Sequence, residues 1–507
     1  MENENSKNNT ILVWFDAGPY AYIHFGVSYA LSKLGKFDFV GIVATKQDVN
    51  FLENQNLMNF KKLFYYPECY QDKSSYDLKT LKELERKYDL DLWLDIFTDR
   101  FFHKYYTHFH HFTKNEILSI AENSAKFFIN ILNEFDPKLI FMQTAGEDFA
   151  NFLLYKLAKK LELKILMTNI VHLHDKISLS NNLISREISE EFHKLISNTD
   201  SSIGQYDLNY IKNQSLAETI KIQSSFTFDN STKFQKISHY AKRLFHDPEP
   251  IYQNLGKTKS KMLQFRYKTP YQTKKRQQFL EKYSFKTIDD EKFLYFPLHT
   301  EPEAKISTTA PFFTDQISLI ENIARSIPID FLLYVKEHPI QKYKFWRSIQ
   351  DYKRIIEIPN VKLFHPSVPS QDLILKSKGV IAISGSSAFE TLFFKKPVFL
   401  FTDEYYDVVS MVKKIETLYQ LPKIIKDTLE NFQFNNNELN AITQASLNAS
   451  ISFRYSSMMK DGILLSSLQR NSGDSKITFE HFKNFYDNYE TDFELLAKTI
   501  CDKTPFN

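Results

Sequence analysis

Short apolar runs that stop at polar or turn residues recur along the chain, and several are followed by apolar positions at helical spacing. The first run, Thr10–Phe15, ends at Asp16, and the pattern of Ala21–Leu34 then predicts a helix that stops at Gly35. Such alternation of strand, loop and helix favours a parallel sheet. Further strands of this sheet are predicted at Phe39–Ala44, Phe60–Tyr66, Leu139–Met142 and Lys164–Thr168.

The same alternation restarts in the second half of the chain. Strands are predicted there at Lys292–Phe296, Phe331–Val335, Val361–Phe364, Gly379–Ile383 and Pro397–Phe401, with helices at Asp315–Ser326 and Asp372–Lys376. The sequence therefore predicts an α/β protein with a Rossmann-like domain over residues 1–200, a helical linker or insertion over 201–290, a second Rossmann-like domain over 291–425 and a helical segment over 426–507.

The predicted insertion carries a basic stretch that begins near Lys257. Its charged members include Arg266, Lys268, Lys274, Lys275 and Arg276. A solvated helix face is favoured over contact with anionic lipid or a glycan, because charge runs on helices usually face water.

Polar residues follow two strands of the second predicted domain. Lys336-Glu337-His338 comes directly after one strand, and Pro339 prevents that strand from continuing. Another strand leads through Ser384-Gly385-Ser386-Ser387 into a helical pattern. Helix N-termini present unpaired N–H groups, and the carboxyl ends of neighbouring parallel strands meet at one edge of a sheet. These residues therefore predict a phosphate-binding site, with Lys336 and His338 as its cations.

Two carboxylates, Glu147 and Asp148, follow the strand at Leu139–Met142 on a short glycine-containing loop. At such a strand end either could act as a general base. The alternative is that Asp148 caps the following helix and Glu147 complements its dipole. His24 and His299 are weaker candidates for the base.

Composition narrows the classes of function. A net charge of +3 over 507 residues argues against a nucleic-acid binder that relies on counterion release. Cys69 and Cys501 lie far apart and lack metal-ligand spacing, in keeping with a reducing cytosol. No uncharged apolar run approaches the roughly 18 residues of a membrane span, so any membrane association is expected to be peripheral.

Four histidines lie close together in the first half of the chain: His103, His108, His110 and His111. They alternate with Phe and Tyr and have no nearby carboxylates at helical ligand spacing, so a surface or acceptor-cleft role is favoured over a metal site.

Three segments of the second domain together resemble the family of capsular polysaccharide biosynthesis proteins, which includes the capsule Kdo transferases. They are His299–Ala304, Tyr334–Pro339 and Ser384–Glu390. The histidine-proline and serine pairs are also similar to those of bacterial sialyltransferases. The resemblance implies a GT-B scaffold, in which two Rossmann-like domains face each other across a cleft. It also implies a cytidine-linked donor, most simply a CMP-sugar, used without a catalytic metal or other cofactor.

The resemblance also implies roles for single residues. Lys336 and His338 would contact the donor phosphate, Ser386 and Ser387 would hydrogen-bond it, and Glu390 would face the ribose or close the turn. His299, Glu301 and Glu303 would bind the donor sugar or orient their loop. The remaining donor-site candidates are Glu337, Pro339, Ser384 and Gly385. The catalytic candidates are His338 and, as the base from the first domain, Glu147 or Asp148.

These features predict a cytoplasmic glycosyltransferase of surface polysaccharide assembly. It would transfer a Kdo-like or sialic-acid-like sugar from a CMP-activated donor to a glycan or lipid-linked acceptor. Peripheral contact with the inner face of the cytoplasmic membrane or with polysaccharide-assembly proteins is a further expectation. Two alternatives remain open: a GT-B transferase or epimerase that uses a UDP-sugar, and a non-catalytic scaffold for capsule assembly.

Overall fold

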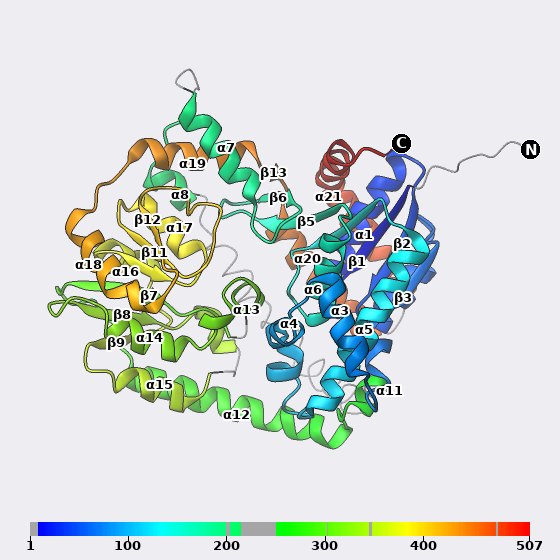
Figure 1. Ribbon diagram of the computed structural model, residues 1–507, viewed down its shortest axis with the longest axis horizontal. Coiled ribbons are helices and arrows are strands. Elements are labelled where there is room, and N and C mark those ends of the chain that lie inside the picture. Colours follow the sequence, from blue (N-terminus) through cyan, green and yellow to red (C-terminus); the bar gives the residue numbers. More distant parts are fainter. Residues whose placement is uncertain are drawn as a thin grey trace, which may run out of the picture.

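A computed structural model describes residues 9–198, 203–213, 250–301, 303–343, 347–472 and 475–506. Each of its two lobes contains one sheet (Figure 1). Residues 214–249 of the predicted linker lie outside the described residues. The predicted α/β architecture is confirmed: two Rossmann-like domains face each other across a cavity that residues of both line, as in a GT-B arrangement.

The first domain is built on a seven-stranded sheet with the order β13-β6-β5-β4-β1-β2-β3. β1 is buried along its whole length, which explains its unbroken apolar sequence. The strands from β1 to β5 pair in parallel, and β6 and β13 add an antiparallel edge. The strands are β1 (Thr10–Phe15), β2 (Asp38–Val43), β3 (Lys62–Tyr65), β4 (Leu139–Gln143), β5 (Ile165–Ile170), β6 (Lys176–Ser180) and β13 (Ile451–Ser452).

The second domain is built on a six-stranded parallel sheet with the order β12-β11-β10-β7-β8-β9. Both of its faces are covered, so alternate residues of one strand enter different cores: Phe293 and Tyr295 enter one, Leu294 and Phe296 the other. The strands are β7 (Phe293–Pro297), β8 (Leu332–Lys336), β9 (Val361–Phe364), β10 (Val380–Ala382), β11 (Val398–Leu400) and β12 (Val412–Lys414).

Helices surround both sheets. Those of the first half are α1 (Pro19–Leu34), α2 (Lys46–Asn54), α3 (Leu78–Tyr88), α4 (Leu92–Thr98), α5 (Lys114–Phe135), α6 (Phe149–Lys160), α7 (Arg186–Ser197) and α8 (Leu208–Asn213). Those of the second half are α11 (Pro250–Asn254), α12 (Lys259–Tyr283), α13 (Ala304–Thr309), α14 (Gln316–Ala324), α15 (Ile349–Ile356), α16 (Ser370–Lys376), α17 (Ser386–Phe393), α18 (Leu421–Asn431), α19 (Asn436–Asn448), α20 (Tyr455–Ser472) and α21 (Ser475–Lys503).

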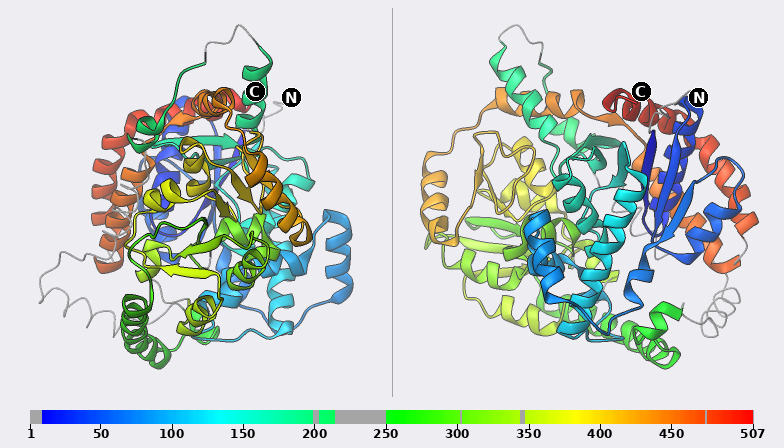
Figure 2. Two further views of the ribbon diagram at one scale, coloured as in Figure 1. Left: turned by 90° about the vertical axis from the view of Figure 1, so that its left-hand side faces the viewer. Right: turned by 45° about the vertical axis from the view of Figure 1, so that its right-hand side comes forward.

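Two segments pack on the lobe that does not contain their neighbours in the sequence. α7 packs on α19 and contributes Ile188 and Phe192 to the core of the second domain. α20 and α21 return to pack on α1 of the first domain, beside its blue strands in Figure 2. There Gly26 leaves room for Phe493, whose ring would lie 2.6 Å from a Cβ at that position. The chain therefore crosses between the lobes again after α19.

The basic stretch lies on α12, which runs along the lower edge of both lobes in Figure 1. Lys268, Lys274 and Lys275 are exposed, as a solvated helix face requires. Arg276 departs from that pattern, because it is buried at 3% exposure close to Glu337 and Tyr352.

His24 of α1 is buried in the first domain, where its Nδ1–H donates to the Trp14 carbonyl at 2.7 Å and its ring contacts Phe141. Burial lowers the pKa of His24 to about 4. The ring is therefore part of the core and does not reach the cavity between the domains.

We expect His24 to make the protein acid-sensitive. At pH values between the pKa of His24 in the folded protein and its ordinary value, the unfolded chain binds more protons at this residue than the folded chain does. Falling pH therefore favours unfolding. From about pH 7 to about pH 5 this group alone should lower the free energy of unfolding by about 2 kcal/mol. Urea unfolding at both pH values measures the loss. His24→Gln, whose amide can still donate to Trp14, should lose correspondingly less, and an equal loss in both proteins would contradict the assignment.

Candidate functional site

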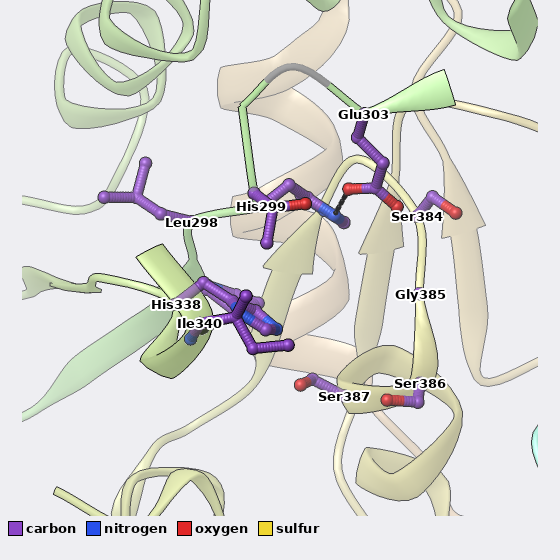
Figure 3. Close-up of a pocket in the computed structure, with 11 residues that line it drawn as sticks. Leu298, His299, Glu303, His338, Ile340, Ser384, Gly385, Ser386 and Ser387 are labelled. Atoms are coloured by element: carbon purple, nitrogen blue, oxygen red, sulfur yellow. Dashed lines mark hydrogen bonds and ion pairs between the residues drawn. The ribbon is translucent and has the colours of Figure 1, made fainter. Parts of the chain in front are cut away.

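A pocket of about 440 Å³ lies beyond the carboxyl ends of β7, β8 and β10. The loop after β7 and the loop after β8 form one wall, and the turn between β10 and α17 forms the other (Figure 3). Seven residues singled out from the sequence line it: His299, Glu303, His338, Ser384, Gly385, Ser386 and Ser387. The structure thus brings together groups that are almost 90 residues apart in sequence, because parallel strands all end at one edge.

The serine turn presents the N-terminus of α17 to the pocket. Gly385 occupies the N-cap position with φ 104°, a conformation that favours glycine, and no side chain caps this helix. The Ser384 hydroxyl donates to the buried carboxylate of Glu404 at 2.5 Å, and the Ser386 hydroxyl bonds to Glu390. Ser387, by contrast, has a hydroxyl without a hydrogen-bond partner in the described part of the chain. Backbone N–H groups and Ser387 are therefore available to an anion.

The two histidines face this turn from the opposite wall (Figure 3). His338 Nδ1 accepts the N–H of Ile340 at 3.3 Å, so the proton of the neutral ring lies on Nε2. His299 Nδ1 lies 3.1 Å from the carboxylate of Glu303, and its Nε2 is buried without a hydrogen-bond partner among the described residues. A buried ring nitrogen at a pocket wall needs a partner, and a bound ligand would supply it.

Glu303 is the acidic member of the pocket. Burial opposes its ionisation, but the charges of His299, His338 and Lys305 hold the pKa of Glu303 below its usual value. Its carboxylate lies 3.1 Å from Nδ1 of His299 and so helps to fix the orientation of that ring at the pocket wall.

An arginine that the sequence did not single out ties the two histidine loops together. Arg347 is fully buried and donates to Glu337 at 2.8 Å, to Glu301 at 3.0 Å and to the carbonyl of His299 at 3.1 Å. Tyr352 also donates to Glu337, at 2.5 Å. Glu301, predicted to bind the donor sugar or orient its loop, and Glu337, predicted to bind the donor, are thus both engaged by Arg347. Pro339 begins the short 3-10 turn Pro339–Tyr343. None of the three lines the pocket.

Lys336 and Glu390 lie behind the pocket wall instead of in it. Lys336 is 3% exposed and donates to Ser370 at 2.7 Å. Burial lowers its pKa to about 8, against the opposing charges of Glu390 and Asp372. Burial also raises the pKa of Glu390 to about 7, against the Ser386 hydrogen bond and the charge of Lys336. Neither Lys336 nor Glu390 lines the pocket in this geometry, and Glu390 is hydrogen-bonded to Ser386 of the turn.

A second network supports the serine turn. Glu404 follows β11, and its buried carboxylate accepts from Lys305 at 2.5 Å as well as from Ser384. Burial opposes its ionisation, yet the charge of Lys305 holds the pKa of Glu404 below its usual value. Tyr406 donates to the Gly385 carbonyl at 3.0 Å. The sequence could have indicated Glu404 as a residue of this site, because it also lies just beyond the end of a strand.

A cavity of about 410 Å³ adjoins the pocket and lies between the domains. The two share Thr300, Glu303 and the Ser384–Ser386 stretch. From the first domain, Glu147 lines the cavity and is ion-paired with Arg100. From the β5–β6 loop His172 also lines it, while its ring stacks on Tyr405 of the second domain at 5.6 Å. Groups from both domains therefore meet beside the pocket.

The two acidic residues of the β4–α6 loop have separate roles. Asp148 is the N-cap of α6, in a capping box with Asn151, and it accepts from Tyr66 at 2.6 Å. It does not line the cavity, so the capping alternative is confirmed for Asp148. Glu147 stays a candidate base. Asp16, at the end of β1, lies nearby: burial, with the charges of Asp148 and Glu147, raises its pKa to about 8, and Gln143 donates to it at 2.5 Å.

The histidines at 103 to 111 do not gather around one point. His110 contacts Glu116 at 3.1 Å, His103 stacks on Phe97 and His108 packs on Phe265. Across the described ranges no group of three or more His, Cys, Asp or Glu is placed to hold a metal ion.

The family model described as "Capsule polysaccharide biosynthesis protein" matches residues 195–464, just over half of the chain. No curated protein matches the sequence. Among solved structures, the KpsC beta Kdo 2,7 transferase of Thermosulfurimonas dismutans is similar over 62% of this chain and 79% of its own, at 12% identity and a TM-score of 0.30. The KpsC beta Kdo 2,4 transferase of the same organism is similar over 60% and 79%, at 10% identity and a TM-score of 0.29.

The UDP-GlcNAc 2-epimerase of Neisseria meningitidis, bound to UDP-GlcNAc, is similar over 87% of this chain and 98% of its own, at 13% identity and a TM-score of 0.28. With identities and TM-scores this low, the assignment of a function depends on the site itself.

We expect Arg347→Met to destabilise the protein by about 3–5 kcal/mol, because it leaves the buried Glu337 carboxylate without its main counter-charge. The nearby Arg276 should keep the loss toward the lower end of that range. Urea unfolding measures it. The double variant Arg347→Met/Glu337→Gln should recover much of the loss, and a double variant no more stable than the single one would contradict the role given to this charge.

Proposed function

This chain belongs to the capsule polysaccharide biosynthesis protein family, and on that premise we propose that it is a glycosyltransferase that uses a CMP-activated donor. The observation that carries the proposal is the pocket in which His299 and His338 face the serine turn. It offers hydrogen-bond donors and partial positive charge at one point, as the phosphate of a nucleotide-sugar requires. The donor sugar is of the Kdo or sialic acid type, and the acceptor is a glycan or glycolipid.

Transfer breaks the bond between the anomeric carbon and the phosphate oxygen, and the bonding electrons leave with CMP. Negative charge therefore grows on the phosphate in the transition state. The Nε2 atoms of both histidines, the Ser387 hydroxyl and the N–H groups of α17 are held in place before the reaction, so they stabilise that charge without reorganising. Arg347 and Glu404 supply this preorganisation by holding the loops.

The acceptor oxygen forms the new bond to the anomeric carbon and gives up its proton. Glu147 is the base we assign, because it lines the cavity next to the pocket and comes from the opposite domain. Arg100, which pairs with it, orients the carboxylate. The Asp148 carboxylate is instead occupied by Asn151 and Tyr66.

The cellular setting is part of the same proposal. The enzyme works in the cytoplasm, with peripheral contact to the inner membrane face or to polysaccharide-assembly proteins. Among the described helices none is long and apolar enough to cross a membrane.

We expect His338→Ala and Ser387→Ala to lower turnover about 100-fold or more, since each removes a donor to the leaving phosphate. CMP release from CMP-Kdo and CMP-sialic acid measures turnover with candidate acceptors. CMP should raise the thermal midpoint of the wild type more than UDP does, and should do so less in both variants. Ser410→Ala, at an exposed serine outside the pocket, is the matched control.

If UDP but not CMP raises the thermal midpoint of the protein, the donor is a UDP-sugar and not a CMP-sugar. No stabilisation by any nucleotide, together with a stable complex with assembly proteins, would identify a scaffold and overturn the proposal.

We expect Glu147→Gln to abolish turnover while the CMP-induced thermal shift stays unchanged, because the base acts on the acceptor and not on the nucleotide. Asp148→Asn is the neighbouring comparison. Asn caps helices about as well as Asp, so this variant should change stability by less than about 1 kcal/mol and leave most of the turnover intact. The reverse outcome, with Asp148→Asn inactive and Glu147→Gln active, would move the base to Asp148.

A further inference from the structure

A separate groove lies between the domains at α4 and the short helix that follows α13. α4 and α13 are in contact between the lobes (Figure 1). The groove encloses about 680 Å³, within the size range of ligand sites, and shares no lining residue with the pocket or the cavity. Its lining residues are Glu85, Asp91, Trp93, Leu94, Phe97, Ser307, Pro311, Phe312 and Thr314. We call it the aromatic groove.

Three of these side chains are large aromatic rings in contact with water. Trp93 is 42% exposed, Phe97 64% and Phe312 85%. Trp93 and Phe97 stand one turn apart on α4 and so share a face, while Phe312 comes from the other domain. Phe97 stacks on His103 at 4.7 Å, which fixes its ring. Exposed rings grouped in a concavity indicate a binding site, since leaving them in water costs free energy.

The charge of the groove limits what it can bind. Its lining residues, all within the described part of the chain, include two carboxylates and no Lys, Arg or His. Glu85 accepts the N–H of Leu92 at 3.2 Å, whereas the Asp91 carboxylate has no hydrogen-bond or ion-pair partner among the described residues and does not cap α4. An anionic bilayer or an acidic sugar would be repelled. An uncharged sugar fits, because its C–H face packs on aromatic rings and its hydroxyls donate to carboxylates.

The groove also lies beside the place where the acceptor must react. α13 separates the two: Lys305, Thr308 and Thr309 line the cavity, and Ser307 lines the groove. On the other domain α4 ends at Thr98, and the chain then reaches Arg100, the partner of Glu147. An acceptor longer than one sugar could thus contact both.

We propose that the aromatic groove is a distal acceptor subsite that binds an uncharged stretch of saccharide through Trp93, Phe97 and Phe312. The assignment rests on the proposed glycosyltransferase function, because it identifies the occupant as part of the acceptor. It specifies the chemistry of the acceptor. The sugars a short distance from the hydroxyl that reacts carry no carboxylate or phosphate.

The test uses the full chain and three neutral probes, maltohexaose, cellohexaose and chitohexaose, with tetragalacturonic acid as the acidic comparison. Saturation-transfer NMR and calorimetric titration measure binding at millimolar concentration. At least one neutral hexasaccharide should bind, and Trp93→Ala/Phe312→Ala should weaken it about tenfold. Because Phe312 is 85% exposed, Phe312→Ala alone should also weaken binding and should keep the thermal midpoint of the wild type. Tyr419→Ala, at an aromatic residue 95% exposed outside the groove, should bind as the wild type does.

Three results would overturn the subsite: no neutral hexasaccharide binds, the double variant binds equally well, or the acidic oligosaccharide binds better. Binding to vesicles of phosphatidylcholine and phosphatidylglycerol that the double variant loses would show a membrane contact instead. The CMP-induced thermal shift, measured on the same samples, separates this inference from the proposed function. A wild type that responds to CMP but not to saccharides refutes the groove alone, whereas one that does not respond to CMP refutes the donor site.

Discussion

The guanidinium of Arg347, without contact to water, makes the interactions on which the pocket beyond β7, β8 and β10 depends. It joins Glu337 after β8 with Glu301 and the His299 carbonyl after β7, so the two loops that carry the pocket histidines are held together. A buried ion pair contributes little net stability, since desolvation offsets its attraction. What it does contribute is position, because an arginine fork bonds only to partners set at fixed angles.

Glu404 holds the serine turn in place, as Arg347 holds the loops that carry the two histidines. Its carboxylate is buried, bonded to Ser384 and paired with Lys305. The two networks engage Glu301, Glu337 and Lys305 near the pocket, and Lys336 is bonded separately to Ser370. What remains directed at the ligand is a set of weaker donors: two imidazoles, one hydroxyl and the N-terminus of a helix. Such a set suits a phosphate that gains charge during the reaction, because it is fixed before that charge appears.

The chain crosses between the lobes several times, and this determines how the cleft is assembled. α7 belongs by packing to the second domain, and α20 and α21 return to the first, where Phe493 fills the space left by Gly26. The β5–β6 loop places His172 against Tyr405 across the boundary. Burial lowers the pKa of His172 to about 4, so this contact stays uncharged at neutral pH. The pocket with the two histidines belongs to one lobe, and the cavity beside it lies where the two lobes meet.

The sequence by itself determined the two sheets and the edge at which the site lies. Short apolar runs such as Thr10–Phe15 and Phe331–Val335 between turn residues are typical of buried strands, and polar residues just after parallel strands gather at the carboxyl edge. This is why His299, His338 and the Ser384–Ser387 turn could be assigned to one pocket. β6 was missed because its Lys176, Ser178 and Ser180 interrupt the apolar pattern.

Only the tertiary structure decided which polar residues face the ligand and which serve the fold. Lys336, Glu337 and His338 are adjacent in sequence, yet the first donates to Ser370, the second binds Arg347 and the third faces the pocket. Arg347 and Glu404 could not be recognised as partners of this site, since their counterparts lie on other loops. Asp148 caps a helix while Glu147 beside it reaches the cavity. The physical reason is the same in each case: the backbone path sets the direction of a side chain, and the available partner depends on segments distant in sequence.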